Sequence, residues 1–357
     1  MLDFFKKKNL FLSEGLIGVD FSNSVVKLAQ VSRGRGRDKV AGYAKKRMPK
    51  GLIKDYLISD EEAFKNFFKE IIESVEGSLQ GRKLAVGVPE AKVFTRVLEI
   101  PLMSKSEAGE TVKWETESNI PISIKDVYYD WQILEKNKKT MRVLVMAAPV
   151  KIIDNYLSAF NRAGYKVAYF EPQSVANGRS VLKFDQKGFS LLVDIGLEYS
   201  NFAVYEDGAP IFVTNSSVCG KVFTDAVVKH LGTSFAKAES YKIKTGLGRN
   251  KKEKEESAKI FASVLANLTQ DIEKTINFFR ENIQEESRKE QIDKIILAGG
   301  GSNLKGLKAY LSHELNMEVR RSNSWTNFNL KGNIPLIPKD EAQSFTTVIG
   351  LSLRNFI

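Results

Sequence analysis

Two segments of this sequence place an aspartate beside small polar residues, between two apolar runs. Residues 15–31 contain Asp20 and residues 190–206 contain Asp194, each at the end of the first apolar run. The small residues that follow are Ser22, Asn23 and Ser24 in the first segment and Gly196, Ser200 and Asn201 in the second. Apolar runs on both sides of such a tip are typical of a β-hairpin. Backbone N–H groups and hydroxyls at the tip could hold phosphate oxygens, while the aspartates hold Mg²⁺, often through water.

The two aspartates lie about half a chain length apart, which indicates two related halves that face each other. Two opposed tips of this kind would suit one phosphate chain with its magnesium ion. Each segment alone is also explained as an ordinary hairpin whose aspartate begins a turn. The repetition favours phosphate binding.

Three consecutive glycines, Gly299, Gly300 and Gly301, follow an apolar run that begins at Ile292. This pattern predicts a strand that leads into the glycines and a helix over residues 304–311. Bare backbone at a helix N-terminus can lie against a flat or charged ligand, so the motif predicts a nucleotide site. Its spacing differs from that of a dinucleotide fold, and it lacks the Lys-Ser/Thr pair of a P-loop. A plain strand-to-helix turn is the alternative, although such turns seldom use three glycines.

The elements around these motifs alternate between strands and helices. In the first half we expect a strand at residues 40–48, a helix with Asp60 as N-cap and an apolar stripe that faces the core, and a strand at residues 84–88. In the second half we expect a helix that carries Glu239 and Lys242 three positions apart. A charged loop at 249–259 and a long amphipathic helix at 260–279 should follow it.

The pattern changes between residues 91 and 164. Ser104 and Glu107 have the spacing of a capping box, which predicts the start of a helix that runs towards Asn119. Strands at 93–100 and 142–147 and a helix at 150–163 complete a small α+β insert. With the strands and helices around it, this is a mixed α/β protein.

Composition limits the protein class. The 357 residues are enough for two domains, and the 43% hydrophobic content is that of a globular protein. No apolar run approaches the roughly 20 residues of a membrane-spanning helix, and we expect no secretory signal. The single cysteine, Cys219, is consistent with a reducing compartment and should be a small buried residue.

The net charge of +11 indicates an acidic partner. No recognition helix, zinc-ligand spacing or stacking motif indicates nucleic acid, so we expect anionic lipid or an acidic protein segment. Residues 2–12 place apolar side chains around three lysines. They could form a short helix on the inner membrane face, or an unstructured terminus.

Three segments resemble the PilM family of type IV pilus assembly proteins: residues 103–134, 143–180 and 193–212. The first two are absent from actin and Hsp70, which share only the general motifs of actin-like ATPases. The resemblance covers essentially the whole chain. It implies an α/β fold of two actin-like (ribonuclease H-like) domains with the small insert, called 1C, that PilM shares with FtsA.

The resemblance also implies domain boundaries. The first domain, 1A, would comprise residues 1–90, 165–188 and 340–357, with the insert 1C at residues 91–164. The second domain would comprise residues 189–339, with subdomain 2B at about 225–290 and 2A in the remainder.

Roles for single residues follow from the same resemblance. The two hairpin tips would form the two phosphate loops, with Asp20 and Asp194 at the metal. Glu171 and Gln173 lie where this superfamily often keeps a residue that positions the attacking water. Glu239 and Lys242 would contact the adenosine sugar and base. The adenosine floor would be Gly299, Gly300, Gly301 and Ser302. The closing helix near Gly350 would pack against the sheet. The second tip departs from the family pattern, because the bulky and acidic Leu197, Glu198 and Tyr199 follow Gly196.

The resemblance implies a cytoplasmic scaffold on the inner face of the inner membrane that binds ATP and Mg²⁺ and captures the N-terminal tail of PilN near the insert. Nucleotide would act as a conformational switch with at most slow hydrolysis, and twitching motility would depend on the assembly. Other platform proteins, the motor ATPase and further copies of the chain are possible partners. The alternatives are an FtsA-like division filament protein, which carries a membrane helix that we do not expect here, and a small-molecule kinase of the same fold.

Overall fold

The computed structural model describes residues 15–22, 24–34, 37–282, 291–330, 336–338 and 341–356. The segment at residues 2–12 and the predicted phosphate residue Asn23 lie outside this part of the chain. The chain divides into two compact units. Unit 1 comprises Met1–Phe184, Trp325–Pro338 and Thr347–Ile357, and unit 2 comprises Asp185–Ser324 and Lys339–Thr346. Within the described residues, no helix is both long and apolar enough to cross a membrane.

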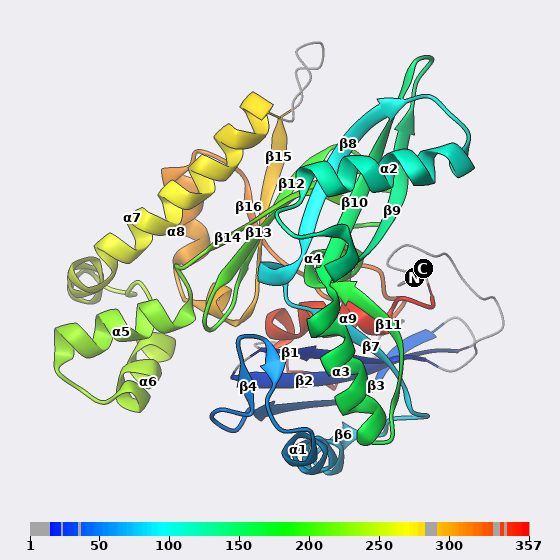
Figure 1. The fold of residues 1–357 in the computed structure, drawn as a ribbon. Coiled ribbons are helices and arrows are strands. Elements are labelled where there is room, and N and C mark those ends of the chain that lie inside the picture. The colour runs from blue at the N-terminus through cyan, green and yellow to red at the C-terminus, as the bar shows by residue number, and fades with distance from the viewer. Residues whose placement is uncertain are drawn as a thin grey trace. The chain divides into compact units, whose positions relative to one another are not determined.

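A six-stranded sheet forms the centre of unit 1 (Figure 1). Its order is β11-β7-β1-β2-β3-β6, and its strands are β1 (Ile17–Phe21), β2 (Val25–Gly34), β3 (Arg37–Arg47), β6 (Glu76–Gly77), β7 (Lys83–Val88) and β11 (Lys166–Pro172). β1 and β2 form the predicted hairpin, and β7 runs parallel to both β1 and β11. The carboxyl ends of these three parallel strands therefore meet at one edge of the sheet, where α/β sheets usually bind ligands.

Two helices, α1 (Glu61–Glu73) and α3 (Val150–Arg162), pack together beside this sheet through aromatic side chains. Asp60 caps α1 as predicted, because its side chain accepts hydrogen bonds from the first backbone N–H groups. Phe64 and Phe68 meet the ring of Phe160 edge to face, with centroids 5.2 Å apart in both pairs. The short strands β4 (Ile53–Lys54) and β5 (Leu57–Ile58) pair with each other, and β5 contacts α3.

The predicted insert contains a separate three-stranded sheet of order β8-β10-β9. It comprises β8 (Phe94–Pro101), α2 (Lys105–Asn119), β9 (Val127–Lys136) and β10 (Thr140–Pro149), with short 3₁₀ turns at Glu90–Lys92 and Ile124–Asp126. The predicted capping box is present, since Ser104 and Glu107 each accept a hydrogen bond from the other's backbone N–H. The predicted range 91–164 therefore contains the three-stranded sheet and also α3, which packs on α1 beside the six-stranded sheet.

Close backbone packing fixes the closing helix α9 (Thr346–Ser352) in unit 1, as predicted. A Cβ on Gly350 would lie 1.8 Å from the carbonyl oxygen of Ala176 in α4 (Gln173–Val181), and one on Gly18 would lie 2.2 Å from that of Val348. Only glycine permits such approaches. The helix α9 therefore lies directly against both α4 and strand β1.

Unit 2 contains a five-stranded sheet of order β14-β13-β12-β15-β16. Its strands are β12 (Phe189–Ile195), β13 (Ser200–Glu206), β14 (Ala209–Ser216), β15 (Ile292–Ala298) and β16 (Val319–Arg321). In each unit the first strand forms a hairpin with the second and pairs in parallel with a later strand, β7 in unit 1 and β15 in unit 2, and that strand pairs in parallel with the last strand of its sheet, β11 or β16. The predicted repeat is thus present as the same strand topology in both units.

The described residues of unit 2 also form four helices, namely α5 (Gly220–Leu231), α6 (Phe235–Thr245), α7 (Lys251–Asn282) and α8 (Leu307–Glu314). The expected charged loop at 249–259 is wrong, because α7 already begins at Lys251. Asn250 accepts a hydrogen bond from the backbone N–H of Glu253, and the Glu253 carboxylate accepts one from Arg249. These bonds cap the helix start. Cys219 is buried, as expected, with 2% exposed.

Candidate functional site

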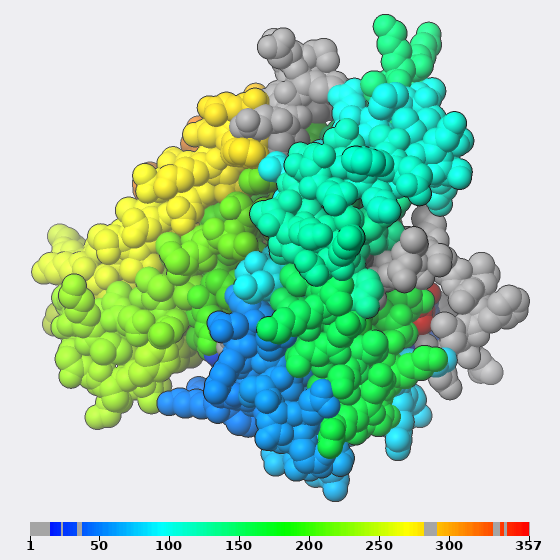
Figure 2. All heavy atoms as spheres, in the orientation of Figure 1, coloured from blue at the N-terminus to red at the C-terminus, as the bar shows by residue number. Residues whose placement is uncertain are grey.

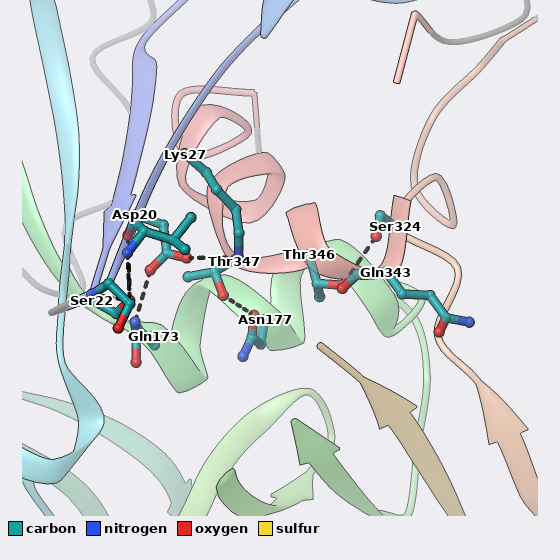
Figure 3. Close-up of polar contacts among 11 residues, drawn as sticks. Asp20, Ser22, Lys27, Gln173, Asn177, Ser324, Gln343, Thr346 and Thr347 are labelled. Carbon is teal, nitrogen blue, oxygen red and sulfur yellow. Dashed lines mark hydrogen bonds and ion pairs between the residues drawn. The ribbon is translucent and has the colours of Figure 1, made fainter. Parts of the chain in front are cut away.

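The carboxylate of Asp20 lies at the end of β1, and only 8% of the residue is exposed. Gln173 donates a hydrogen bond from Nε2 to Oδ1 over 2.8 Å, and Lys27 Nζ lies 3.7 Å from Oδ2. Lys27 stands directly opposite Asp20 in the β1–β2 pairing, so strand register places the ammonium beside the carboxylate. Figure 3 shows both partners directed at Asp20. Two predicted site residues, Asp20 and Gln173, therefore contact each other.

Glu90 completes this polar cluster at the end of β7. Its carboxylate accepts hydrogen bonds from the backbone N–H of Ser174 at 2.8 Å and from Ser174 Oγ at 3.0 Å. It thereby caps α4, whose own N-cap residue is a proline without a side-chain hydrogen bond. The backbone N–H of Glu90 also donates to Gln173 Oε1, at 3.4 Å. The amide of Gln173 is thus fixed from both ends, towards Glu90 and towards Asp20.

The first hairpin tip is held by its own serine. Ser22 Oγ accepts hydrogen bonds from the backbone N–H groups of Ser24 and Val25, at 3.3 and 3.2 Å. The backbone N–H of Ser22 donates to the carbonyl oxygen of Val25 at 2.9 Å. This is the local side-chain-to-backbone pattern of a serine turn. Two of the backbone N–H groups at this tip therefore point at the Ser22 hydroxyl.

Glu171 is fully buried between two arginines. Arg179 donates from Nη1 and Nη2 to the two carboxylate oxygens at 2.6 and 2.5 Å, and Arg354 Nη1 donates to Oε1. The guanidinium of Arg354 also lies over the ring of Tyr169, 4.3 Å from its centroid. Burial raises the pKa of the Glu171 carboxyl, but the two guanidinium groups lower it by more, so the net shift is downward. Its contacts join β11, α4 and the turn that follows α9.

In unit 2, Asp194 lies directly against the first glycine of the triple-glycine motif. A Cβ on Gly299 would be 2.3 Å from Asp194 Oδ1 and 2.4 Å from the carbonyl oxygen of Ile195, and Gly299 has a φ of +77°. A Cβ on Gly301 would be 2.3 Å from Cγ2 of Ile195. Two of the three glycines are therefore needed so that the chain after β15 can pass the end of β12.

Gly300 differs from its two neighbours. A Cβ there would meet only Ser344 Cβ, at 3.8 Å, and Gly300 is exposed to solvent. The Gly300 backbone is thus open to solvent, and no neighbour in the described part of the chain would clash with a side chain at this position. Of the three glycines, this one has the bare accessible surface that the sequence motif predicts for a ligand.

The predicted helix N-terminus after the glycines is wrong in detail. Residues Gly300–Asn303 form a 3₁₀ turn, and α8 begins only at Leu307, after Gly306 in a left-handed conformation. Ser302 is fully buried, with Oγ 2.7 Å from the carbonyl oxygen of Gly299 and 2.8 Å from Gln343 Oε1. Its hydroxyl holds the turn together, and the backbone N–H of Gly299 donates to the carbonyl oxygen of Gln343.

The second hairpin tip packs on the start of α5 through backbone atoms. The N–H groups of Gly220 and Lys221 donate to the carbonyl oxygens of Gly196 and Leu197, both at 2.9 Å. Ser200 Oγ donates to the carbonyl oxygen of Val218 at 2.6 Å. The first two N–H groups of α5, which have no partner within a helix, are therefore satisfied by the tip.

Glu239 and Lys242 form the predicted pair on α6, and the pair is bonded to α5. Lys242 Nζ lies 2.7 Å from Glu239 Oε2 and donates to the carbonyl oxygen of Gly220 at 3.0 Å and to Thr224 Oγ1 at 2.9 Å. Thr224 Oγ1 donates in turn to the Glu239 carboxylate. Lys242 is 8% exposed, whereas the Glu239 side chain keeps 30% of its surface in solvent. Glu239 is thus the more accessible of the two.

The end of α6 lies against the segment that follows the glycines. The backbone N–H of Leu247 donates to the carbonyl oxygen of Lys305 at 2.8 Å, and a Cβ on Gly246 would clash with the Lys305 backbone. Unit 2 therefore brings three predicted parts together, namely the Asp194 hairpin, the triple glycine and the helix of Glu239.

Sequence reasoning missed three polar residues that contact the predicted ones. Lys27 was detectable, because a strand register that puts residues 20 and 27 opposite each other follows from a short hairpin turn. Glu90 directly follows the Val-Pro that ends β7, so its position at the strand's carboxyl end was also detectable. Gln343 gave no local signal, since it reaches the glycines from a remote part of the sequence.

A groove of about 690 Å³ lies at the opposite end of β15 from the triple glycine. Ile292, the first residue of β15, lines it together with residues of α7 and of the turn before β16, such as Arg280, Asp293 and Glu318. A strand of this length spans roughly 20 Å. None of the predicted nucleotide residues lines this groove.

The carboxylates fit a hydrated magnesium ion more closely than a protein-only metal cage. Among the described residues, no three His, Cys, Asp or Glu side chains gather to hold a metal. Magnesium bound with a nucleotide needs only one or two carboxylates, because phosphates and water complete its shell. Asp20 and Asp194 each supply one carboxylate at a hairpin.

Solved structures similar to this chain share its fold. The structure of a "PilM-PilN type IV pilus biogenesis complex" matches with a TM-score of 0.78 and 23% identity, covering 97% of this chain and 99% of that one. The ethanolamine utilization protein EutJ from Carboxydothermus hydrogenoformans matches with a TM-score of 0.55 and 16% identity over 98% and 92% of the two chains. MreB5 of Spiroplasma citri bound to AMPPNP matches with a TM-score of 0.54 and 11% identity over 96% of each. The fold is therefore the expected two-domain actin-like one.

A family model decides among these relatives. The model for the type IV pilus assembly protein PilM matches residues 18–356, which include the hairpins, the insert and the triple glycine. The chain belongs to the PilM family of type IV pilus assembly proteins.

Proposed function

We propose that this chain is a pilus-assembly scaffold that binds the N-terminal cytoplasmic tail of PilN. The observation that carries the proposal is the match of the family model to residues 18–356, which includes the whole insert. A similar structure, covering 97% of this chain, is that of a complex between PilM and PilN. A scaffold of this kind would work in the cytoplasm, on the inner face of the inner membrane.

The docking surface that we propose is the junction of the insert with α3. Tyr128 of β9 donates to the Asp154 carboxylate of α3 at 3.0 Å, which fixes the junction. Beside it, the partly exposed Phe94, Ile124 and Tyr129 pack on a small apolar cluster. Ile122 is 42% exposed in the segment between α2 and β9. Partly exposed apolar and aromatic side chains at a fixed junction are typical of peptide-binding surfaces.

The test compares two exposed apolar residues at opposite ends of α2. Ile122 follows the helix and Leu102, which is 45% exposed, precedes it, so roughly 20 Å separates them. Ile122→Asp should weaken the binding of a PilN tail peptide at least tenfold, and Leu102→Asp should leave it unchanged, as measured by fluorescence anisotropy. Equal loss in both variants, or in neither, would contradict this docking surface. Point variants are preferable to deletion of residues 91–164, because the deletion would remove α3 from the core.

We also propose that the chain binds ATP with Mg²⁺. In unit 2, Gly300 would form the open part of the adenosine floor, and the accessible Glu239 carboxylate would contact the sugar. In unit 1, Asp20 would hold the magnesium ion through water, and Lys27 would contact phosphate oxygens. Asp194 would hold the ion from the second hairpin. The phosphates would supply the negative charge that Lys27 and the magnesium ion bind.

Gly300→Val tests this assignment without disturbing the fold. The added side chain would enter open space, so the thermal midpoint should stay unchanged while MgATP affinity falls at least tenfold. Gly109→Val is the matched control, because a Cβ on Gly109 meets nothing within 4 Å. Asp20→Ala and Asp194→Ala should each weaken binding in the presence of Mg²⁺. Unchanged MgATP titrations in the Gly300 and aspartate variants would refute the site.

Nucleotide would act as a switch for the peptide. A ligand that favours one arrangement of the protein raises the affinity of any partner that favours the same arrangement. MgATP should therefore change the peptide affinity, and the peptide should change MgATP affinity by the same factor. If the chain turns ATP over, we assign the positioning of water to Gln173, whose amide reaches Asp20, and not to Glu171, which is bonded to two arginines. Gln173→Ala would then lower turnover without a matching loss of MgATP affinity.

A further inference from the structure

Helix α2 of the insert carries a tryptophan on its solvent face. Trp114 has 71% of its surface exposed, the largest exposed fraction among the large apolar side chains that the structure describes. Ala108 and Val112 of α2 are fully buried against β8 and β10. At about 100° per residue, Trp114 lies roughly 120–160° around the helix from these two residues. Figure 1 shows α2 along one face of the three-stranded sheet, and Figure 2 shows it (turquoise) at the surface of the molecule. Trp114 therefore belongs to the outer face of α2 and not to the core.

Three glutamates surround Trp114 on this face. Glu110 precedes it by one turn and Glu117 follows it by one turn, while Glu107 precedes it by two turns. At about 100° per residue, all three lie within roughly 60° of Trp114 around the helix. All three are exposed, and within the described residues Glu110 and Glu117 form no ion pair. Hydrogen bonds from Ser104 lower the pKa of the Glu107 carboxyl, so it is charged near neutral pH. The outer face of α2 is therefore anionic around an aromatic centre.

The two lysines of α2 do not neutralise this face. Lys113 lies roughly 100° from Trp114 around the helix, and Lys105 lies on the opposite side, roughly 180° away. The chain as a whole carries a net charge of +11, so this face differs in sign from the protein around it. Carboxylates beside an indole ring suit a cationic partner, because they pair with lysine or arginine while the face of the ring attracts the same cations. The outer face of α2 thus fits a segment that combines clustered positive charge with apolar side chains.

The chain itself contains such a segment among residues 1–14, which lie outside the described part. Three consecutive lysines, Lys6–Lys8, follow Phe4 and Phe5 and precede the apolar residues 10–12. The segment leads into Gly15, the first described residue, which belongs to unit 1 as α2 does. An extended chain spans about 3.5 Å per residue, so the lysines can reach roughly 25–30 Å from Gly15. That reach exceeds the radius of gyration of about 17 Å expected for a unit of this size.

We propose that the N-terminal segment, residues 2–12, docks on the outer face of α2 in the same molecule. Its three lysines would pair with the three glutamates, and a phenylalanine would pack against Trp114. The tether to Gly15 favours this occupant over the same segment of a second copy, because it raises the effective concentration of the segment near α2. None of the residues that we propose for PilN or nucleotide binding lies on this face, so the inference stands apart from the proposed function.

Acrylamide quenching of Trp114 fluorescence tests the proposal in the full chain. The contribution of Trp114 is the difference between wild type and Trp114→Phe, which leaves out the other two tryptophans. Because acrylamide is uncharged, charge substitutions do not alter its local concentration. Lys6→Glu with Lys7→Glu and Lys8→Glu should raise the quenching constant of Trp114, measured from fluorescence lifetimes, at least twofold. The reason is that the released segment would no longer cover the indole ring.

A charge swap separates docking from a local effect of the substitutions. Glu110→Lys with Glu117→Lys should raise the quenching constant to a similar extent, and Glu107 is retained because it caps α2. Combining these two substitutions with the three lysine reversals should bring the constant back towards the wild-type value, because opposite charges face each other again. Circular dichroism would establish that α2 remains folded in each variant.

A matched control comes from α1, where Lys65→Glu with Lys69→Glu reverses two exposed lysines and should leave the quenching of Trp114 unchanged. Quenching in wild type that equals quenching in the variant with reversed N-terminal lysines would overturn the proposal. A combined variant that stays as exposed as the separate ones would also overturn it. Protection of Trp114 that increases with protein concentration would assign the face to the segment of a second copy and would overturn docking within one molecule.

Discussion

The two aspartate hairpins have the same strand topology but are held in place by different kinds of contact. In unit 1, polar and charged side chains surround Asp20, since Gln173 and Lys27 contact its carboxylate and Ser22 closes the turn. In unit 2, carbonyl oxygens at the tip after Asp194 accept from the start of α5, and the buried Ser200 hydroxyl donates to the carbonyl oxygen of Val218. Gly299 gives the chain room beside the Asp194 carboxylate.

This difference determines which substitutions each unit should tolerate. A hairpin held by side chains loses stability when a polar group is removed, because a buried partner is left without its hydrogen bond. A hairpin held by close backbone packing loses stability when atoms are added, because the backbone cannot move aside. The contacts around Asp20 should therefore be sensitive to deletion of charge and polar groups, and the packing of Gly299 against Asp194 to the addition of a methyl group.

The largest effect should come from Glu171→Gln in unit 1. The substitution removes the negative charge between Arg179 and Arg354 and leaves two guanidinium groups buried near each other. Breaking a buried ion pair in this way costs about 3–5 kcal/mol of unfolding free energy. Urea unfolding monitored by circular dichroism would measure the loss. A loss below about 1 kcal/mol would show that the cluster contributes no more than an exposed pair does.

The same carboxyl predicts a dependence on pH. Its folded-state pKa lies below the ordinary value of 4.5, so the unfolded chain takes up a proton first as the pH falls. The stabilisation is complete above the ordinary pKa and is lost as the pH falls through the lowered folded-state value. The free-energy difference between wild type and Glu171→Gln should therefore be constant near neutral pH and shrink in acid. A difference that grows in acid would contradict this sign.

Gly299→Ala should have the next largest effect, this time in unit 2. A left-handed conformation disfavours alanine, and the new methyl group would overlap the Asp194 carboxylate and the backbone of Ile195, so we expect a loss of about 2–4 kcal/mol. Gly300→Ala is the matched control in the same motif and should change stability little, since its Cβ enters open space. Equal losses of unfolding free energy in the two variants would contradict the view that Gly299 is needed for packing and Gly300 is not.

Local signals explain why much of the fold could be predicted from the sequence. The capping residues Asp60 and Ser104 act over three or four positions, so they place helix starts without any knowledge of the tertiary structure. The start of α7 had such a signal as well, in Asn250 and Glu253. Its many lysines and glutamates were interpreted as a loop because they form no apolar stripe, although both residue types favour helices.

The site could be predicted only in part, because its contacts join remote parts of the sequence. The aspartates and glycines were visible as motifs. Which of the glycines is needed for packing and which is open to solvent depends on how closely β15 passes β12. The pairing of Glu171 with Arg354 links residues that are far apart in the chain, and no local pattern announces it. For the same reason the bonds of Lys242 to α5 were not visible in the sequence.

Gln173→Ala should lower the free energy of unfolding by less than Gly299→Ala does, and its effect should be confined to the contacts around Asp20 in unit 1. The variant removes the hydrogen bond to the buried Asp20 carboxylate and the acceptor of the Glu90 backbone N–H, which should cost about 1–3 kcal/mol. Gln80→Ala is the control for the same chemical change at an exposed position, where the side chain bonds Ser78. A loss no larger than that of the control would mean that water replaces the amide, and that Asp20 does not depend on this partner.

Ser22→Ala should have the smallest effect, and it separates the two hairpins most directly when paired with Ser200→Ala. Ser22 is partly exposed, so water can replace its hydroxyl at the backbone N–H groups of Ser24 and Val25, and we expect a loss of about 0.5–1 kcal/mol. Ser200 is fully buried, and its removal leaves the carbonyl oxygen of Val218 without the hydroxyl that bonds it, so its loss should be about 1–3 kcal/mol. Both differences can be measured by urea unfolding at neutral pH. A larger loss for Ser22→Ala than for Ser200→Ala would contradict this expectation. It would mean that the burial of the two hydroxyls does not determine how much each one stabilises its hairpin tip.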